Sequence, residues 1–208
     1  MIFKFLKNKS GFTLIEILVS ISILLLISGA AISIFVSVVM GQRAILAGQE
    51  ISSQMSYTLE YISKALRMAG RDFTGSCIIG ANGESGLNYL LTKYDPGKGI
   101  YKGIKFINQS DNNACQEFFL DDSNPSKTII KGVKNGGQPV SLTSDKINIS
   151  SFKFIINGDA KPGAIDHSSD SDMIQPRITI SLAASFWGSN NLPARIQTTI
   201  SQKNLNIK

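Results

Sequence analysis

An apolar run near the N-terminus constrains the fold of this chain more than any other feature of its sequence. From Phe12 to Met40, Glu16 is the only charged residue. At about 1.5 Å per residue, a helix of this length exceeds the roughly 30 Å of a membrane's hydrocarbon core. The segment can therefore span a membrane, and its one carboxylate requires an explanation.

The residues on either side of this run predict its orientation. Lys4, Lys7 and Lys9 are the only charged residues before it, whereas the chain after Met40 carries charges of both signs. Basic residues that precede a first membrane span remain in the cytoplasm. We therefore expect a single span in the cytoplasmic (inner) membrane, with the N-terminus inside and the following residues outside.

The expected outer part contains the two cysteines of the chain, Cys77 and Cys115. Disulfides persist outside the cytoplasm, and an even number of cysteines in an exported domain favours a bridge. The alternative is a pair of buried thiols. A bridge that closes a loop of this length would stabilise the fold by roughly 3 to 4 kcal/mol in the chain-entropy model.

The formal net charge of +6 gives little support to a polyanionic partner. Three of the 21 basic residues precede the apolar run, and the rest of the chain sets the remaining basic residues against 15 acidic ones. The excess of basic over acidic residues in the rest of the chain is therefore small. Nucleic acid is therefore not expected as a partner.

After Met40 the helical pattern continues but becomes amphipathic. Apolar residues recur in steps of three or four at Ile51, Met55, Leu59, Ile62, Leu66 and Ala69. This spacing places them on one face of a helix. We expect one long helix from about Phe12 to Ala69, membrane-like over 12–40 and amphipathic over 41–70, with Gly70 as its end signal.

Two segments near the C-terminus have the clearest strand pattern. Apolar and polar residues alternate in RITISLAASF, residues 177–186, and in ARIQTTISQ, residues 194–202. This period of two predicts strands. Weaker candidates are IKFI, EFFL and KTIIKGV, at residues 104–107, 117–120 and 127–133.

The segment KINISSFKFII, residues 146–156, also alternates but changes its parity. Ile149 is its last apolar residue at an odd position, and Phe152 is the first at an even position. The change predicts a β-bulge near Ser150 and Ser151, or two strands that meet there.

Together these segments predict an α+β fold. The residues from 71 to 208 are numerous enough to bury a core of their own. The simplest architecture packs an antiparallel sheet, formed by this β-rich head domain, against the apolar stripe of the long helix.

Two explanations that involve no other molecule are compatible with part of the sequence around Glu16. In TLIE, the Thr13 hydroxyl and the Glu16 carboxylate can cap free N–H groups of a helix that begins there. Alternatively, the basic start, the apolar core and the small residues SGA form an ordinary secretory signal. Capping leaves Gly11 and Phe12 unexplained, and the apolar run continues well beyond SGA.

The segment KSGFTLIEILVS resembles the processing signal of type IV prepilins and of the pseudopilins of type II secretion systems. The shared features are a short basic leader, a glycine at the cut, a phenylalanine next, a glutamate one helical turn further and an unbroken apolar helix. Less specific patterns resemble the heads of PilW-type minor pilins and J-type minor pseudopilins. They are ALRMAGRDF, INISSFKFIINGD, QPRITISLAAS and RIQTTISQKN.

The resemblance implies a processing site and an assembly residue. Residues 1–11 would be a leader that a prepilin peptidase/methyltransferase removes after Gly11, and Phe12 would become the N-methylated terminus. Glu16 would pair with this terminal amine on a neighbouring pilin or pseudopilin subunit. The implied fold is type IV pilin-like, with a transmembrane and filament-core helix over 12–40, its amphipathic continuation over 41–70 and a head over 71–208.

The resemblance also implies a structural function. Many major pilins carry a proline in the membrane half of the helix, but this chain has none between Phe12 and Met40, which favours a minor subunit. We expect a minor pilin that takes part in assembly or priming of a type IV pilus, and not an enzyme. The alternatives are a minor pseudopilin of a type II secretion system, or a tip adhesin or DNA-uptake pilin that uses Lys93, Lys98, Lys102 and Lys105.

The remaining candidate sites are weak, and we expect no catalytic residue, metal or cofactor. GKGIYKG, residues 97–103, lacks the glycine spacing of a phosphate loop. His167 is the only histidine, and an exposed position is expected for it. Trp187 is expected to pack in the core or at an edge. A solvated loop is favoured over a calcium site for Asp159, Asp166, Asp170 and Asp172, which lack EF-hand spacing.

Overall fold

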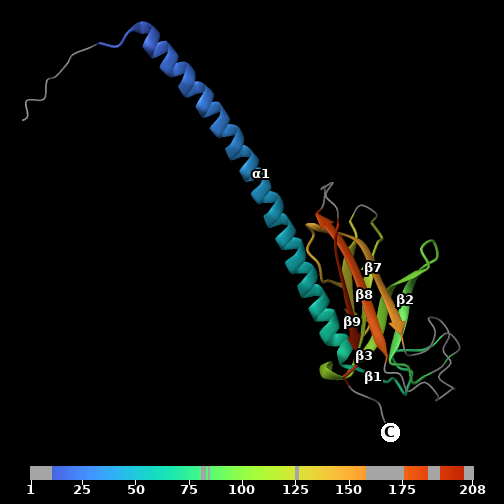
Figure 1. The fold of residues 1–208 in the computed structure, drawn as a ribbon. Coiled ribbons are helices and arrows are strands. Elements are labelled where there is room, and N and C mark those ends of the chain that lie inside the picture. Colours follow the sequence, from blue (N-terminus) through green and yellow to red (C-terminus); the bar gives the residue numbers. More distant parts are fainter. Residues whose placement is uncertain are drawn as a thin grey trace, which may run out of the picture. The chain divides into compact units, whose positions relative to one another are not determined.

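The computed structural model of the chain describes residues 11–80, 83, 85–124, 127–157, 176–186 and 193–203. The chain forms two units, Met1–Leu46 and Ala47–Lys208, whose boundary lies within one helix (Figure 1). The first unit contains the N-terminal part of this helix. The second unit contains its C-terminal part together with a β-sheet.

Helix α1 extends from Leu14 to Arg67, which confirms the single long helix that the sequence predicts. In the first unit its large apolar side chains are exposed, except for the half-buried Val39. The hydroxyls of Ser20, Ser22 and Ser33 donate to carbonyls of their own helix at 2.7 to 2.8 Å, so these polar groups are satisfied without water. By length and composition, α1 can cross a membrane.

In the second unit, α1 packs against the sheet through the predicted apolar stripe. Each residue of the stripe is at most 8% exposed, and the stripe consists of Ile51, Met55, Leu59, Ile62, Leu66 and Ala69. Thr58 lies on the same buried face, and its hydroxyl donates to the carbonyl of Leu142 at 3.4 Å. The periodicity therefore identified the face of the helix that the sheet covers.

The sheet is antiparallel at every pairing among the described residues. Its order is β6-β5-β4-β3-β7-β8-β9, and β1 and β2 also pair with β3. All the predicted strand segments lie within strands or overlap them. The strands are β1 Ala69–Gly70, β2 Tyr89–Asp95, β3 Ile100–Asn108, β4 Ala114–Asp121, β5 Ile129–Lys134, β6 Val140–Ser141, β7 Ile147–Asn157, β8 Arg177–Phe186 and β9 Ala194–Ser201.

Strand β7 contains the predicted bulge. Its ladder to β8 shifts register between Ile149 and Ser151, and the Ser150 hydroxyl donates to the carbonyl of Ala183 at 3.2 Å. Because the bulge adds one residue, Ile149 and Phe152 can both face the core despite their different parity. Their exposed fractions are 1% and 0%.

The hairpin of β2 and β3 is only partly predicted by the sequence. Strand β2 is largely half-exposed, and Lys93 within it has a left-handed φ of 54°, so its local alternation is weak. Strand β2 is therefore stabilised mainly by its pairing with β3, since its own sequence alternates only weakly. GKGIYKG forms part of the hairpin turn and the beginning of β3, which agrees with its rejection as a phosphate loop.

The end of α1 differs from the prediction. Gly70 is not a helix cap, because it lies in β1 and its φ is not positive. The carbonyl of Arg67 accepts from the N–H of Lys203 at 2.8 Å, and that of Met68 accepts from the N–H of Gln109 at 2.9 Å. The helix end is therefore satisfied by distant segments instead of a local glycine cap. A Cβ at Gly70 would lie 2.7 Å from Cγ of Gln109, so the glycine permits a close approach.

Candidate functional site

The residues around the predicted processing site lie at the exposed start of α1. Gly11, Phe12 and Thr13 precede the helix, and Glu16 lies in its first turn. The N–H of Glu16 donates to the carbonyl of Thr13 at 3.1 Å and to its hydroxyl at 3.4 Å. Thr13 therefore caps the helix, which is one half of the predicted capping box.

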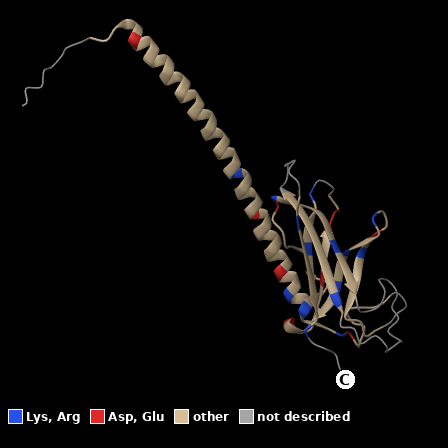
Figure 2. Cartoon of the chain, in the orientation of Figure 1, with Lys and Arg blue, Asp and Glu red and all other residues tan. Residues whose placement is uncertain are grey.

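The Glu16 carboxylate does not supply the other half of the capping box. It makes no hydrogen bond and no ion pair with any residue that the structure describes. Helix α1 carries no other charge before Arg43 (Figure 2). An ionised group in an apolar segment is costly without a partner, and no residue that the structure describes supplies one for Glu16.

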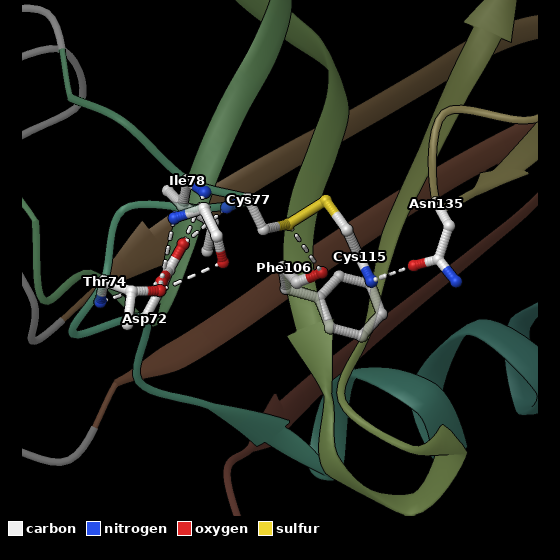
Figure 3. The surroundings of a disulfide bond; sticks show 8 residues. Asp72, Thr74, Cys77, Ile78, Phe106, Cys115 and Asn135 are labelled. Carbon is white, nitrogen blue, oxygen red and sulfur yellow. Dashed lines mark hydrogen bonds between the residues drawn. A yellow bond between two sulfur atoms is a disulfide. The ribbon is translucent and has the colours of Figure 1, made fainter.

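A second organised site in the head surrounds the disulfide between Cys77 and Cys115 (Figure 3). The bridge confirms the predicted pairing and joins the segment after α1 to strand β4. On the β4 side, the N–H of Cys115 donates to Oδ1 of Asn135 at 2.8 Å. The N–H of Asn135 donates back to the carbonyl of Cys115 at 2.7 Å. The Cys115 end of the bridge is therefore held by hydrogen bonds as well as by sulfur.

Asp72 organises the segment that carries Cys77, and its side chain is buried (Figure 3). Its Oδ2 accepts from the N–H groups of Cys77 and Ile78 at 2.8 and 2.7 Å. Its Oδ1 accepts from the Thr74 hydroxyl at 3.0 Å and from the N–H groups of Thr74 and Ser76 at 3.2 and 3.3 Å. Burial raises the pKa of Asp72, but these hydrogen bonds outweigh burial and lower the pKa below its usual value.

Sequence reasoning did not single out Asp72. The available signal was DFTGSC, in which hydroxyl residues follow the aspartate at two and four positions. This pattern is typical of loops in which an aspartate side chain accepts hydrogen bonds from nearby N–H groups. Asp72 also forms an isolated β-bridge with Leu87, a non-local contact that no local pattern reveals.

Two of the four lysines considered for a polyanion-binding head are engaged within the head. The ammonium of Lys102 lies 2.7 Å from the carboxylates of both Asp95 and Asp122. The hydrogen bond to Asp122, followed by that to Asp95, raises the pKa of Lys102, and the contact with Lys102 lowers the pKa of Asp95. Lys93 lies 5.1 Å from the ring centre of Phe119. These contacts weaken the case for a free basic patch.

Other predicted sites lie outside the described residues. They are most of the leader, His167, Trp187 and the acidic residues between 159 and 172. Within the described ranges, no group of three His, Cys, Asp or Glu side chains could hold a metal ion.

Comparison with known families matches the first turns of α1 and the residues before them. A family described as the prokaryotic N-terminal methylation motif matches residues 6–32. Comparisons with curated proteins and with solved structures found no significant match. The matched motif is that of type IV prepilins and pseudopilins and implies processing by a prepilin peptidase. The apolar helix that contains it is consistent with anchoring in the inner membrane.

The fold and the motif both indicate a pilin-like protein. The long N-terminal helix packs, through its C-terminal part, on an antiparallel sheet, which is a pilin-like α+β arrangement. The motif is that of structural filament subunits, so the protein is structural and not an enzyme. The chain is therefore a type IV prepilin-like protein that carries the N-terminal methylation motif within residues 6–32.

Proposed function

We propose that this chain is a minor pilin subunit of the PilW type that takes part in the assembly or priming of a type IV pilus. The observation that carries the proposal is the Glu16 carboxylate, which lacks a partner among the described residues although it belongs to an apolar helix. The absence of proline between Phe12 and Met40 favours a minor over a major subunit.

The proposed partner of Glu16 is created by processing. A prepilin peptidase/methyltransferase would remove residues 1–11 by cutting after Gly11, and would then methylate the new amine of Phe12. The resulting cation lies in surroundings of low dielectric, where a carboxylate on an adjacent chain stabilises it strongly. Glu16, which lies one helical turn after Phe12, would supply this carboxylate to a neighbouring chain.

Pairing of Phe12 on one chain with Glu16 on the next would give the assembly its direction. The two chains must be offset along their axes, so each uses a different surface for the contact. Such heterologous contacts repeat into a helical filament instead of closing into a dimer. Residues 12–40 would occupy first the inner membrane and then the filament core, residues 41–70 would continue the helix, and the head over 71–208 would lie outside the cytoplasm.

Processing is tested with Gly11→Val. A branched side chain at the cut should block the peptidase, so the accumulated protein should migrate more slowly on a gel than the processed wild type. Gly29→Val, a change at a glycine within α1 that lies in open space, serves as the control and should be processed normally. Equal mobility of Gly11→Val and wild type would contradict the cleavage site.

Assembly is tested with Glu16→Gln. The amide cannot neutralise an amine, whereas Thr13 still caps the helix, so membrane insertion should persist and recovery in sheared pili should fall. Glu50→Gln, at a carboxylate beyond the apolar run, should assemble normally. Normal assembly of Glu16→Gln would reduce Glu16 to a local helix-capping residue. Recovery only from a periplasmic secretion filament would favour the pseudopilin alternative.

A further inference from the structure

Strand β9 forms one edge of the sheet and has a free side. It is the last strand in the order of the sheet, and it pairs with β8 in an unbroken ladder from Ala194 to Ser201. Within the described residues, its backbone N–H and C=O groups form hydrogen bonds only to β8. Because every second residue of an edge strand points these groups away from its neighbour, the outer side of β9 can accept another strand.

The other edges of the sheet are protected in ways that β9 is not. Strands β1 and β6 have only two residues each. Among the described residues β2 pairs only with β3, and the positive φ of Lys93 interrupts it. By contrast, β9 contains no proline, no residue with a positive φ and no register shift. Short edges, kinks and bulges prevent pairing with other chains, so β9 is the edge on which such pairing is possible.

The two faces of β9 predict the side-chain pattern of a partner strand. On the face that contacts the core, Ile200 is buried, and Ala194 and Ile196 are half-buried. The residues that alternate with them are exposed, and they are Arg195, Gln197, Thr199 and Ser201. A strand beside β9 would therefore bury apolar side chains on one face, next to Ile196, and keep polar side chains on the other.

The exposed face of β7, β8 and β9 carries only positive charge. Arg195 lies on β9 itself, and the register places Arg177 of β8 opposite Ser201. Lys153 of β7 lies in the row that contains Gln197. The three cations form no ion pair with a described residue, and the three strands contain no Asp or Glu. A partner strand with carboxylates on its exposed face would complement this charge.

We propose that β9 binds an extended, acidic segment of a different protein as an additional strand of the sheet. The backbone of the partner would pair with the outer side of β9, with a carboxylate beside Arg195 and apolar side chains beside Ile196. A second copy of this chain does not suit the edge, because its β9 offers no carboxylate to Arg195. The inference goes beyond the proposed function, since docking on β9 requires neither processing at Gly11 nor pairing of Glu16.

Binding is tested with the purified full-length chain in detergent and a fluorescein-labelled synthetic peptide of six Glu-Val repeats. This probe has the required alternation, and its anisotropy should rise to saturation as the chain is added. A probe with lysine in place of glutamate should bind at least about tenfold more weakly, because its charges repel Arg195. Anisotropy of the Glu-Val probe that does not saturate would overturn the proposal.

N-methylation of the probe tests the pairing of the two backbones. In an added strand, the N–H groups of every second residue face β9, and those of the remaining residues face solvent. One probe is methylated on all its glutamate nitrogens and another on all its valine nitrogens. One of them should lose binding and the other should keep it. Equal effects of the two methylations would show that charge alone attracts the peptide, which contradicts strand addition.

The contribution of Arg195 is tested with Arg195→Glu. Reversal of this charge should weaken binding of the Glu-Val probe by about fivefold or more, because like charges on adjacent strands are unfavourable. Lys98→Glu changes the net charge equally, but at an exposed turn between β2 and β3, and should leave binding unchanged. The same weakening in both variants would assign the effect to net charge and remove the site from β9.

Hydrogen exchange at single amides tests whether the edge is free. In the chain alone, every second amide of β9 should exchange rapidly, and the Glu-Val probe should slow this exchange. Protection at every chain concentration would show that the chain covers β9 with its own residues. Protection that rises with chain concentration would show that a second copy occupies the edge. Either result would overturn the proposal.

Docking on β9 and the proposed function can fail separately. Arg195→Glu should be processed and recovered in sheared pili like the wild type. A chain that is processed and assembled but does not bind the probe would overturn strand addition alone. A chain that binds the probe but is neither processed nor assembled would overturn the proposed function and leave strand addition intact.

Discussion

The side-chain amide of Gln202 donates a hydrogen bond of 2.7 Å to the carbonyl of Ala69, although 133 positions separate the two residues. Both residues are buried, at 5% and 0% exposure. The Tyr89 hydroxyl makes a comparable bond of 2.8 Å to the carbonyl of Leu66. Residues from the sheet and from the C-terminal segment therefore donate to the carbonyl groups at the end of α1 and just after it.

Loss of the Gln202 amide should destabilise the head. Gln202→Ala leaves the buried carbonyl of Ala69 without this donor, so we expect the free energy of unfolding to fall by about 1 to 3 kcal/mol. Chemical denaturation of the purified full-length chain in detergent measures the change. Gln197→Ala, at an exposed position of β9, should change it by less than about 0.5 kcal/mol. Equal effects of the two substitutions would contradict the role given to Gln202.

Removal of the charge at Asp72 should loosen the loop formed by residues 71–79. In Asp72→Asn, one of the two acceptor oxygens becomes an amide nitrogen, so either the N–H groups of Cys77 and Ile78 or the Thr74 and Ser76 donors lose their acceptor. We expect a loss of roughly 2 kcal/mol or more of folding stability, since hydrogen bonds to charged groups contribute about 1.5 to 3 kcal/mol each. The midpoint of denaturant unfolding measures this loss.

The matched control for Asp72 is Asp145→Asn. The Asp145 side chain is 78% exposed and pairs with Lys127 at 3.0 Å, so the substitution should have little effect. A second measurement is the reactivity of the thiols. Asp72→Asn should increase the fraction of chains in which Cys77 and Cys115 react with a thiol reagent during folding, and an unchanged fraction would show that Asp72 does not position Cys77.

Stability should fall in acid through Asp121 as well as Asp72. The hydrogen bond from Lys131, followed by those from Ser123, lowers the pKa of Asp121 from 3.8 to about 2. Because the folded pKa lies below the unfolded one, this carboxylate stabilises the fold above about pH 4, and its contribution is lost as pH falls toward 2. Asp72, whose pKa is also lowered, acts in the same direction.

Denaturant unfolding between about pH 2 and 6 measures this dependence. The midpoint should decrease below about pH 4 in the wild type, and Asp121→Asn should show a shallower decrease and a lower midpoint at neutral pH. The contribution will be moderate, since the Lys131 and Asp121 side chains are 27% and 20% exposed. A decrease of the same size in Asp121→Asn would assign the acid sensitivity to other groups.

Reduction of the disulfide should destabilise the head. Without the bond between Cys77 and Cys115 the unfolded chain gains conformational freedom, and loss of a native disulfide from a small exported domain typically costs about 2 to 5 kcal/mol. Unfolding with and without a reductant measures the difference. The double variant Cys77→Ser, Cys115→Ser should unfold at the reduced midpoint and respond no further to reductant.

The local sequence was enough to predict α1, its buried stripe, β8, β9, the bulge in β7 and the processing motif. Each of these depends on a periodicity or spacing that is complete within a short segment. The alternation from Arg177 to Phe186 is an example, because it specifies both the strand and its buried side. The lack of a partner for the Glu16 carboxylate among the described residues likewise follows from its position in an apolar run without another charge.

The features that the sequence left undecided depend on residues far apart along the chain. Gly70 follows the last apolar residue of the stripe and is expected from the sequence to cap the helix. Donors from Gln109, Gln202 and Lys203 instead bind the carbonyl groups at and just after the end of the helix. Lys102 reads as a free cation, but two carboxylates from different segments neutralise it.

Periodicity therefore determined which elements form and which faces they bury, because burial selects side chains one segment at a time. Only the tertiary structure decided where α1 ends, which carboxylates pair with Lys102 and how Asp72 holds the loop formed by residues 71–79. The physical reason is that a buried polar group needs a partner, and in this protein those partners come from other segments of the chain.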